Sequence, residues 1–438
     1  MAQEKKKMSV VQLTIITAIN MMGSGIIMLP TNLAEVGTMS ILSWLVTALG
    51  AMALAYAFSR AGMYTSKGGG MGGYAEYSFG KAGAFLANYT YGASLVIANA
   101  AIAISAVGYA AVLFGADLNP LEVALWTIFT LWLATILNFG GARITGRIST
   151  FTVWGVIIPV IAISILGWFW FSGTRYINAW NPYHFSFFKG IGKSISITLW
   201  AFLGLESASA NMDSVENPKK NVPIAVLGGT IGAAIMYILS TNIMAGIVPN
   251  QALLHSNAPF GLAFSTMFTP AIGNIVMALM ILSCFGSLLG WQFTIAEVFR
   301  SSAHEKYFPK IFSKVIGNGT PLVGMLIITA CQSLLALMTI SPSLSKQFTI
   351  LVNLAVVTNV IPYLLSMASL KTMQLEENVP KAKQRKTNLI ATIAAIYSLY
   401  ALYTAGSVAL MGGSIVTFAG WILYGFISHR FDARKALN

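Results

Sequence analysis

One acidic residue stands inside a long apolar stretch of the sequence. Glu206 lies within the apolar segment 190–211, whereas most of the other acids lie in loops or near the ends of expected helices. A charge at the centre of a membrane costs roughly 2.5–3.5 kcal/mol even on a lenient insertion scale, so such a position usually has a functional cause. We expect the carboxylate to receive a substrate ammonium group or a proton. The alternative is a carboxyl group that stays protonated or pairs with polar backbone at a helix break.

Glycine interrupts the first apolar stretch at Gly23-Ser24-Gly25. A helix that restarts at Ser24 would direct unpaired N–H groups and the positive end of its dipole into the membrane interior, which suits a carboxylate. Glycine pairs also allow close packing of helices. A matching interruption at Gly204, near Glu206, favours a binding site at the two breaks.

Aromatic and amide side chains in the same expected spans could complete the site. Trp291 lies in the middle of its span, away from the membrane boundary that tryptophan prefers. Aromatic faces can hold an alkylammonium group through contacts of about 0.5–2 kcal/mol each. Packing and hydrogen bonding between helices are the alternative roles. The candidates are Trp200, Phe202, Trp291 and Tyr91 for an aromatic cage, and Asn20 and Asn99 for hydrogen bonds to substrate.

A glycine-rich segment, 68–73, precedes Glu76 in an expected cytoplasmic loop. The run has no Lys-Ser/Thr ending and is therefore not a phosphate-binding loop. Glu76 could draw cations toward an inner vestibule. An ordinary solvated acid is the simpler interpretation.

Apolar helices are the elements that must position these residues. The 438 residues are 56% hydrophobic and 9% charged, whereas about 25% of a typical soluble domain is charged. The stretches 124–138 and 151–171 are apolar on every face, which excludes the alternating strands of a membrane barrel. We predict an all-α polytopic membrane protein, with residues 1–438 in one transporter domain. About twelve spans are expected, near 9–33, 38–60, 82–114, 121–140, 148–171, 190–211, 222–248, 260–300, 320–340, 347–370, 388–405 and 410–428.

The net charge of +13 is distributed unevenly. If the N-terminus is cytoplasmic, the segments expected outside hold only Arg175, Lys189, Lys193 and Lys346 of the 26 basic residues. The positive-inside rule therefore predicts that both termini are cytoplasmic. The charge reports orientation in membrane lipid, and we expect no nucleic-acid partner.

Other classes of protein lack support in the sequence. Cys284 and Cys331 have no ligand-like spacing, and the histidines fall in expected loops or helix ends, so we expect no disulfide, metal or cofactor. A channel would need an oligomeric pore or a ring of charges. An enzyme would need several acids, histidines or nucleophiles that converge within the spans. Secondary transport is the remaining interpretation.

Several segments in combination resemble the basic amino acid/polyamine antiporters of the amino acid–polyamine–organocation superfamily. The resemblance covers essentially the whole chain. Its segments are Asn20–Ile26, Gly72–Tyr74, Asn138–Gly141, Trp200–Ser207, Glu216–Pro218 and Pro223.

The resemblance implies two inverted repeats of five helices, near 9–171 and 190–370, with discontinuous first and sixth helices and two extra helices within 388–428. It implies alternating access in a bacterial inner membrane, often as a homodimer. The substrates would be small cationic amines and basic amino acids. Exchange of putrescine for ornithine is the expected activity, with proton-coupled putrescine uptake as a second mode; lysine–cadaverine and arginine–agmatine exchange are alternatives.

The resemblance also implies roles for particular residues. The amides of Gly23, Ser24 and Gly25 would hold the carboxylate of ornithine, and Glu206 would bind an amine or a coupled proton. Residues that would line or gate the cavity, or contact substrate, are Trp200, Trp291, Tyr91, Asn20 and Asn99.

Overall fold

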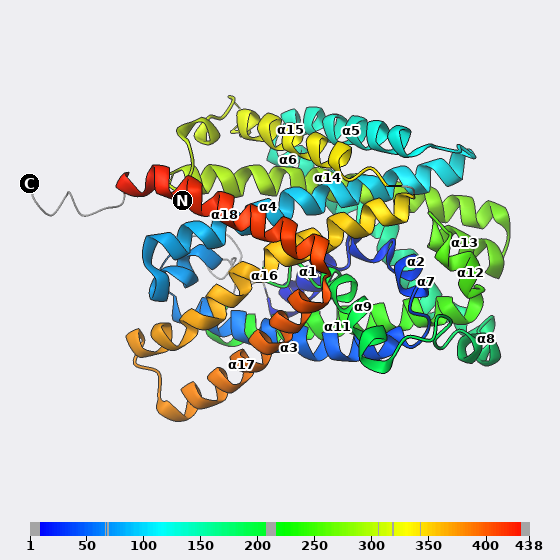
Figure 1. Cartoon of the computed structure of the whole chain (residues 1–438), viewed down its shortest axis with the longest axis horizontal. Coiled ribbons are helices and arrows are strands. Elements are labelled where there is room, and N and C mark those ends of the chain that lie inside the picture. Colours follow the sequence, from blue (N-terminus) through cyan, green and yellow to red (C-terminus); the bar gives the residue numbers. More distant parts are fainter. Residues whose placement is uncertain are drawn as a thin grey trace, which may run out of the picture.

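The computed structural model describes residues 9–65, 67, 70–206, 216–304, 306–317, 319–341 and 343–430. Within these residues the chain forms helices joined by loops, and no strand (Figure 1). The elements of the first half are α1 Val10–Met21, η1 Ser24–Ile26, α2 Leu29–Ala34, α3 Ser40–Tyr64, α4 Met71–Phe114, α5 Pro120–Leu137, η2 Asn138–Gly140, α6 Ala142–Thr152, α7 Trp154–Leu166, η3 Gly167–Phe169, α8 Gly173–Asn178 and α9 Phe187–Trp200. Those of the second half are α11 Pro218–Ile247, α12 Asn250–Leu254, α13 Pro259–Met267, α14 Pro270–His304, η5 Lys310–Ser313, α15 Leu322–Met338, α16 Leu344–Glu376, α17 Lys381–Thr404, α18 Ser407–Ile427 and η6 Ser428–Arg430.

Nine helical stretches of the described chain are long and apolar enough to cross a membrane. The expected spans 9–33, 190–211 and 320–340 are not among them. The first is divided into α1, η1 and α2, the second leaves helical geometry after Trp200, and the third, α15, is a shorter apolar helix. The prediction of an all-helical polytopic protein is confirmed, and the two expected interruptions lie where the glycines predicted them.

The start of α4 differs from the expected span 82–114. Residues 71–79 are also helical, and the break comes at Gly80, whose φ of 60° is in the left-handed region. Glycine adopts that conformation at little cost. The segment expected to be a loop around Glu76 is therefore a short helix in front of the long one.

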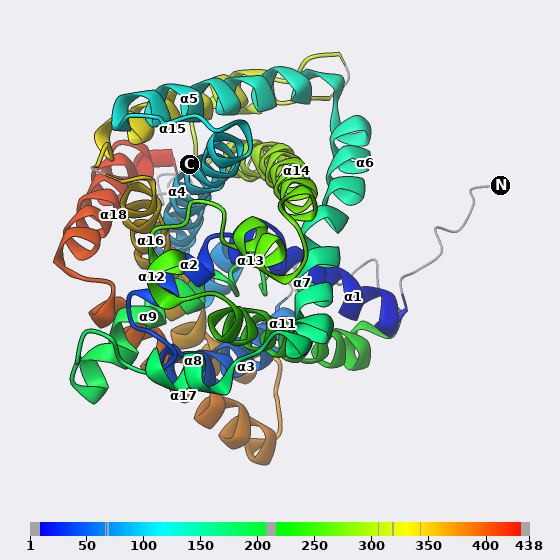
Figure 2. The same cartoon turned by 90° about the vertical axis from the view of Figure 1, so that its right-hand side faces the viewer.

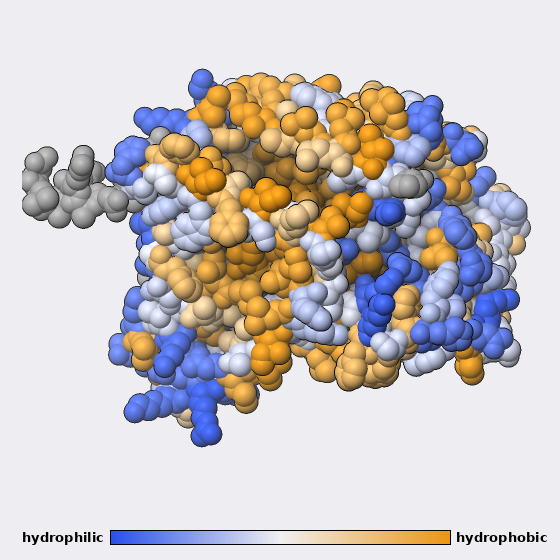
Figure 3. Space-filling view, viewed as in Figure 1, coloured by the Kyte–Doolittle hydropathy of each residue, from blue (hydrophilic) through white to orange (hydrophobic). Residues whose placement is uncertain are grey.

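The long helices surround the broken ones. α4 and α16 pack along one another, and α4 also packs against α14. In the end view of Figure 2, α2 lies inside the bundle, where it contacts α9, α11 and α12. On the face shown in Figure 3, apolar residues cover the middle and hydrophilic residues gather toward both ends, as in a protein that spans a bilayer.

Candidate functional site: a cavity between two broken helices

The first break follows α1. Regular helical bonding ends where the Met22 N–H donates to the Ala18 carbonyl at 2.8 Å. Neither Gly23 nor Gly25 has a positive φ, so backbone conformation does not require glycine at either position. What the two glycines contribute is a backbone without a covering side chain. A Cβ on Gly25 would lie 3.6 Å from the Ala201 Cα, which belongs to the second break. This distance is an ordinary contact, so a methyl group would fit, and its absence leaves the backbone at Gly25 uncovered beside the second break.

The second break follows Trp200 at the end of α9. Residues 201–206 form turns, and Gly204 has a φ of 104°, a conformation that side chains disfavour. This turn directs the Gly204 N–H onto the Glu206 Oε2 at 3.1 Å. Gly204 therefore fixes the position of the acid. Ser207 lies outside the described residues.

Two buried tyrosines satisfy backbone carbonyls that the breaks release. The Tyr109 hydroxyl on α4 donates to the Ile27 carbonyl at 3.1 Å and accepts from the Phe260 N–H at 3.2 Å. The Tyr237 hydroxyl on α11 donates to the Ala201 carbonyl at 2.8 Å. Because an unpaired buried carbonyl costs about 1–3 kcal/mol, these bonds stabilise both interruptions.

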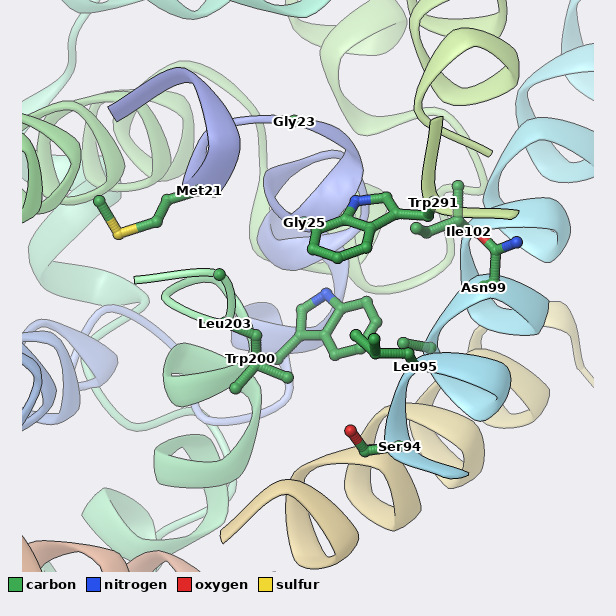
Figure 4. A pocket seen from close by; sticks show the side chains of 12 residues that line it. Met21, Gly23, Gly25, Ser94, Leu95, Asn99, Ile102, Trp200, Leu203 and Trp291 are labelled. Carbon is green, nitrogen blue, oxygen red and sulfur yellow. The ribbon is translucent and has the colours of Figure 1, made fainter. Parts of the chain in front are cut away.

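A cavity lies between the two breaks and one side of α4. Its volume is about 50 Å³. Figure 4 shows the rings of Trp200 and Trp291 close together near Gly25, with α4 on the other side. The lining residues are Met21, Gly23, Gly25, Ser94, Leu95, Ala98, Asn99, Ile102, Trp200, Leu203, Gly204 and Trp291.

Two polar side-chain atoms of the described lining are buried without a hydrogen-bond partner. The Trp200 Nε1 is buried without a hydrogen-bond acceptor, and it lies 3.8 Å from where a Cβ on Gly25 would be. The Asn99 Oδ1 is buried without a donor. A ligand in the cavity could satisfy both atoms, since one is a donor and the other an acceptor.

Glu206 lies beside the cavity and outside its lining. The residue is 7% exposed. Its Oε1 accepts from the Tyr91 hydroxyl at 3.1 Å, and its Oε2 accepts from the Tyr363 hydroxyl at 2.6 Å and from the Gly204 N–H. No lysine or arginine of the described chain forms an ion pair with it. The acid thus joins α4, α16 and the second break through neutral donors, which hold the place that a cationic ligand could take.

Comparison with known proteins decides the family. The sequence profile of the amino acid permeases matches residues 8–427. The chain belongs to the amino acid permease family. The putrescine transporter PotE of Haemophilus influenzae is 67% identical over 435 residues, which are 99% of this chain and 100% of that protein. PotE of Escherichia coli is 65% identical over 436 residues, 99% of each chain. The cadaverine/lysine antiporter of Escherichia coli is 32% identical over 435 residues, 98% of this chain and 95% of the relative.

The family and the nine apolar spans make this permease a multi-pass bacterial membrane protein. The resemblance inferred from the sequence motifs is confirmed, and so is the expectation of a transporter in place of an enzyme.

The structure of the permease brings most of the candidate residues together. Gly23, Gly25, Asn99, Trp200 and Trp291 line the cavity. Tyr91 contacts Glu206. The side chains of Asn20 and Ser24 lie outside what the structure describes.

Phe202 is the exception. Its ring is fully buried edge-on against the stacked rings of Trp44 and Tyr237, with ring centroids 6.3 Å and 5.4 Å away, and it is absent from the cavity lining. Its assignment to the aromatic cage is therefore not supported by the structure. Residues two positions apart in a helix or tight turn face different directions, so Phe202 points into the core when Trp200 faces the cavity.

Glu76 lies at a separate hollow that it lines with Lys67 and Lys81. Its Oε1 is 3.0 Å from the Lys81 Nζ and 3.4 Å from the Lys67 Nζ. Two cations thus compensate this acid, and it offers little free negative charge to a cationic substrate.

Two residues of the site, Tyr363 and Gln292, were not predicted from the sequence. Tyr363 follows Pro362 within an apolar span, and Gln292 follows Trp291. Their polarity inside apolar helices was the available signal. Their importance comes from contacts with Glu206 in the second break and with Asn99 on α4, which are distant in sequence.

Proposed function

We propose that this permease exchanges putrescine for ornithine across the bacterial inner membrane by alternating access. Support comes from two relatives that are named putrescine transporters and are at least 65% identical over 99% of the chain. One structural observation carries the chemistry: the cavity between the breaks is walled by Trp200 and Trp291 and lies beside the buried Glu206.

The cationic end of the substrate finds two kinds of partner. Indole faces attract an ammonium group by about 2 kcal/mol when it is desolvated. Glu206 supplies a full negative charge once an ammonium group replaces a tyrosine hydroxyl at its carboxylate. Both putrescine and ornithine carry such a group.

The carboxylate of ornithine finds its partners at the other pole. The backbone of Gly23 and Gly25 lies open to the cavity, and the Trp200 Nε1 offers an unused donor beside Gly25. A carboxylate favours backbone N–H groups at an interrupted helix. Putrescine lacks a carboxylate and would rely on the cationic pole.

Exchange follows if the empty permease rarely switches the side of the membrane to which its cavity opens. An acid without a cationic partner in a medium of low dielectric is costly, so a bound cation would lower the barrier in both directions. Export of a dication in exchange for a monocation moves one net charge, worth about 2.3 kcal/mol per 100 mV. An inside-negative potential opposes this export, so the solute gradients would drive it. Without ornithine, a proton on Glu206 could accompany putrescine uptake.

The proposal also covers the membrane topology, the internal repeats and the assembly of the permease. Both termini would be cytoplasmic because basic residues gather on that side. Residues 9–171 and 190–370 would form inverted repeats, with the extra helices within 388–428 added, and a homodimer is the proposed assembly.

The second candidate function is exchange of lysine for cadaverine. It has the support of the cadaverine/lysine antiporter, which is 32% identical. The higher identity of the putrescine transporters favours the first candidate. Exchange of arginine for agmatine is a third pair with the same charges.

Counterflow into proteoliposomes tests the proposal. Vesicles loaded with putrescine should accumulate radiolabelled ornithine, and Glu206→Gln should slow uptake about tenfold or more, as expected for one lost charged contact. Glu122→Gln is the matched control. The Glu122 carboxylate accepts a hydrogen bond from the backbone N–H of exposed Asn119 at the start of α5, away from the cavity. Uptake only with cadaverine or agmatine inside would replace the substrate pair. Unchanged uptake by Glu206→Gln would refute the role of the acid.

A further inference from the structure

Gln292 connects the cavity wall to a buried polar network. Its neighbour Trp291 lines the cavity, whereas Gln292 is fully buried and reaches toward α5 and α15. Such amides in a membrane interior require partners on all sides. The partners of Gln292 belong to three other helices, α4, α5 and α15.

The threonine side of this network accepts hydrogen bonds. The Gln292 Nε2 donates to the Thr135 Oγ1 at 3.1 Å and to the Thr329 Oγ1 at 2.7 Å. Each threonine has one hydroxyl proton. The two hydroxyl oxygens lie 2.6 Å apart, so one proton joins them, and the other has a backbone acceptor, the Leu131 carbonyl at 3.0 Å or the Met325 carbonyl at 2.8 Å. Only lone pairs remain for Gln292. The amide nitrogen must therefore face the threonines.

The opposite side of Gln292 presents its oxygen. The Oε1 accepts from the Asn99 Nδ2 at 2.7 Å and from the Gln332 Nε2 at 3.0 Å. Gln332 has its own fixed acceptor, because its Nε2 also lies 3.4 Å from the Val96 carbonyl. Both sides of the network thus require the same orientation of Gln292.

This arrangement fixes the orientation of the Asn99 amide. Its nitrogen is committed to Gln292, and its Oδ1 is buried without a donor in a residue that lines the cavity. Figure 4 shows the oxygen on the side of Trp291 and the nitrogen turned away from it. A buried acceptor without a partner costs about 1–3 kcal/mol, which a ligand could recover.

We propose that Gln292 is a positioning residue that holds Asn99 as a hydrogen-bond acceptor for an ammonium group of the substrate. An ammonium group donates three hydrogen bonds and accepts none, so it fits this oxygen, whereas a carboxylate is repelled by it. This inference rests on the proposed function and adds a second recognition point to it.

The spacing along α4 agrees with a diamine. Tyr91, which contacts Glu206, precedes Asn99 by eight residues, or about 12 Å of helix. Ser94, Leu95 and Ala98 line the cavity between them. An extended four-carbon diamine spans about 6 Å between nitrogens, which this length of helix can accommodate with a hydrogen bond of about 3 Å at each end. One ammonium group would approach Asn99 and the other Glu206.

Putrescine binding to the purified full-length permease, measured by calorimetry in detergent, tests the relay. Gln292→Met keeps the length of the side chain and removes the amide; Asn99→Leu removes the acceptor. Each should raise the Kd about tenfold, the usual value of a hydrogen bond to a charged group. Gln374→Met is the matched control, because it deletes an equally buried amide, on α16, that has no hydrogen bond to Asn99, Gln292 or their partners. It should change the Kd less than about threefold.

The double variant Asn99→Leu/Gln292→Met separates positioning from a general loss of stability. If Gln292 acts through Asn99, the double variant binds putrescine about as well as Asn99→Leu alone. If the two losses of affinity multiply in the double variant, or if Gln292→Met and Gln374→Met lose affinity equally, the proposal is overturned. If Gln292→Met does not fold, the isosteric Thr329→Val removes the nearer acceptor and should raise the Kd about two- to threefold.

The failure of the proposed function gives a different pattern. Wild-type permease that does not bind putrescine contradicts that function. The same variants titrated with cadaverine then decide whether Asn99 and Gln292 are coupled.

Discussion

The Tyr363 hydroxyl lies 2.6 Å from the Glu206 Oε2 and joins the long helix α16 to the turn that follows α9. Tyr91 on α4 approaches the other oxygen at 3.1 Å. A single carboxylate therefore holds three elements together in the described state. A cation that competes for this carboxylate would loosen the contact between them, which links occupancy of the cavity to movement of the helices.

Replacement of Tyr363 by phenylalanine tests this link. The variant loses the shorter of the two hydroxyl contacts, and hydrogen bonds to charged groups contribute about 1.5–3 kcal/mol. We expect Tyr363→Phe to lower the melting temperature without ligand more than Tyr91→Phe does. Putrescine should restore more stability in Tyr363→Phe than in the wild type, measured by thermal unfolding in detergent.

The control for the tyrosine variants is Tyr403→Phe, whose side chain is largely exposed on α17. It should unfold as the wild type does. Equal melting temperatures for Tyr363→Phe and Tyr403→Phe would contradict the structural role of the hydroxyl.

Gly204 allows a comparison between two glycines with positive φ. Gly204→Ala strains the turn by about 1 kcal/mol or more and displaces the N–H that donates to Glu206, so we expect counterflow to fall at least several-fold. Gly80→Ala imposes a similar backbone strain, but no atom lies within 4 Å of the added Cβ. Its transport rate should stay within about twofold of the wild type. Equal losses in both variants would assign the effect to strain alone.

The helix breaks could be predicted from the sequence because glycine and a buried acid are local signals. α1 ends at Met21 and α9 at Trp200, within the interruptions expected from Gly23 and Gly204. The helical segment 71–79 was expected to be a loop, since glycine lowers helix propensity by about 1 kcal/mol per residue. Burial of Met71 and Tyr74 in the core outweighs this cost.

The partners within the site could not be predicted in the same way. Tyr363 and Glu206 are separated by 157 residues, and Asn99 and Gln292 by 193. Such contacts depend on how α4, α14 and α16 pack, which the hydropathy of each helix does not specify. The direction of the Phe202 side chain could have been predicted, because its two-residue spacing from Trp200 already places the two rings on different sides.

Gly25 should distinguish amino acid from amine. A Cβ at this position meets only ordinary contacts of 3.6 Å or more, so Gly25→Ala should fold normally. The methyl group would cover backbone at the pole proposed for the carboxylate. We expect the half-saturation concentration for ornithine to rise about tenfold and that for putrescine less than threefold, both measured by counterflow.

The control for Gly25→Ala is Gly232→Ala in α11, where no atom lies within 4 Å of the added Cβ. This variant should leave both concentrations unchanged. A parallel rise for ornithine and putrescine in Gly25→Ala would argue against a separate carboxylate pole.

Phe202 and Trp200 should separate stability from recognition. Phe202 packs edge-on against Trp44 and Tyr237, and deletion of a buried aromatic ring costs about 3–5 kcal/mol. Phe202→Leu keeps most of this packing, so it should lower the melting temperature by a few degrees and leave the Kd for putrescine within about twofold. Trp200→Leu removes an indole face from the cavity and should raise that Kd about five- to thirtyfold, the value of one desolvated cation–π contact. A larger loss of affinity in Phe202→Leu than in Trp200→Leu would place Phe202 in the cage after all, because a ring confined to the core acts on the substrate only through the stability of the turn.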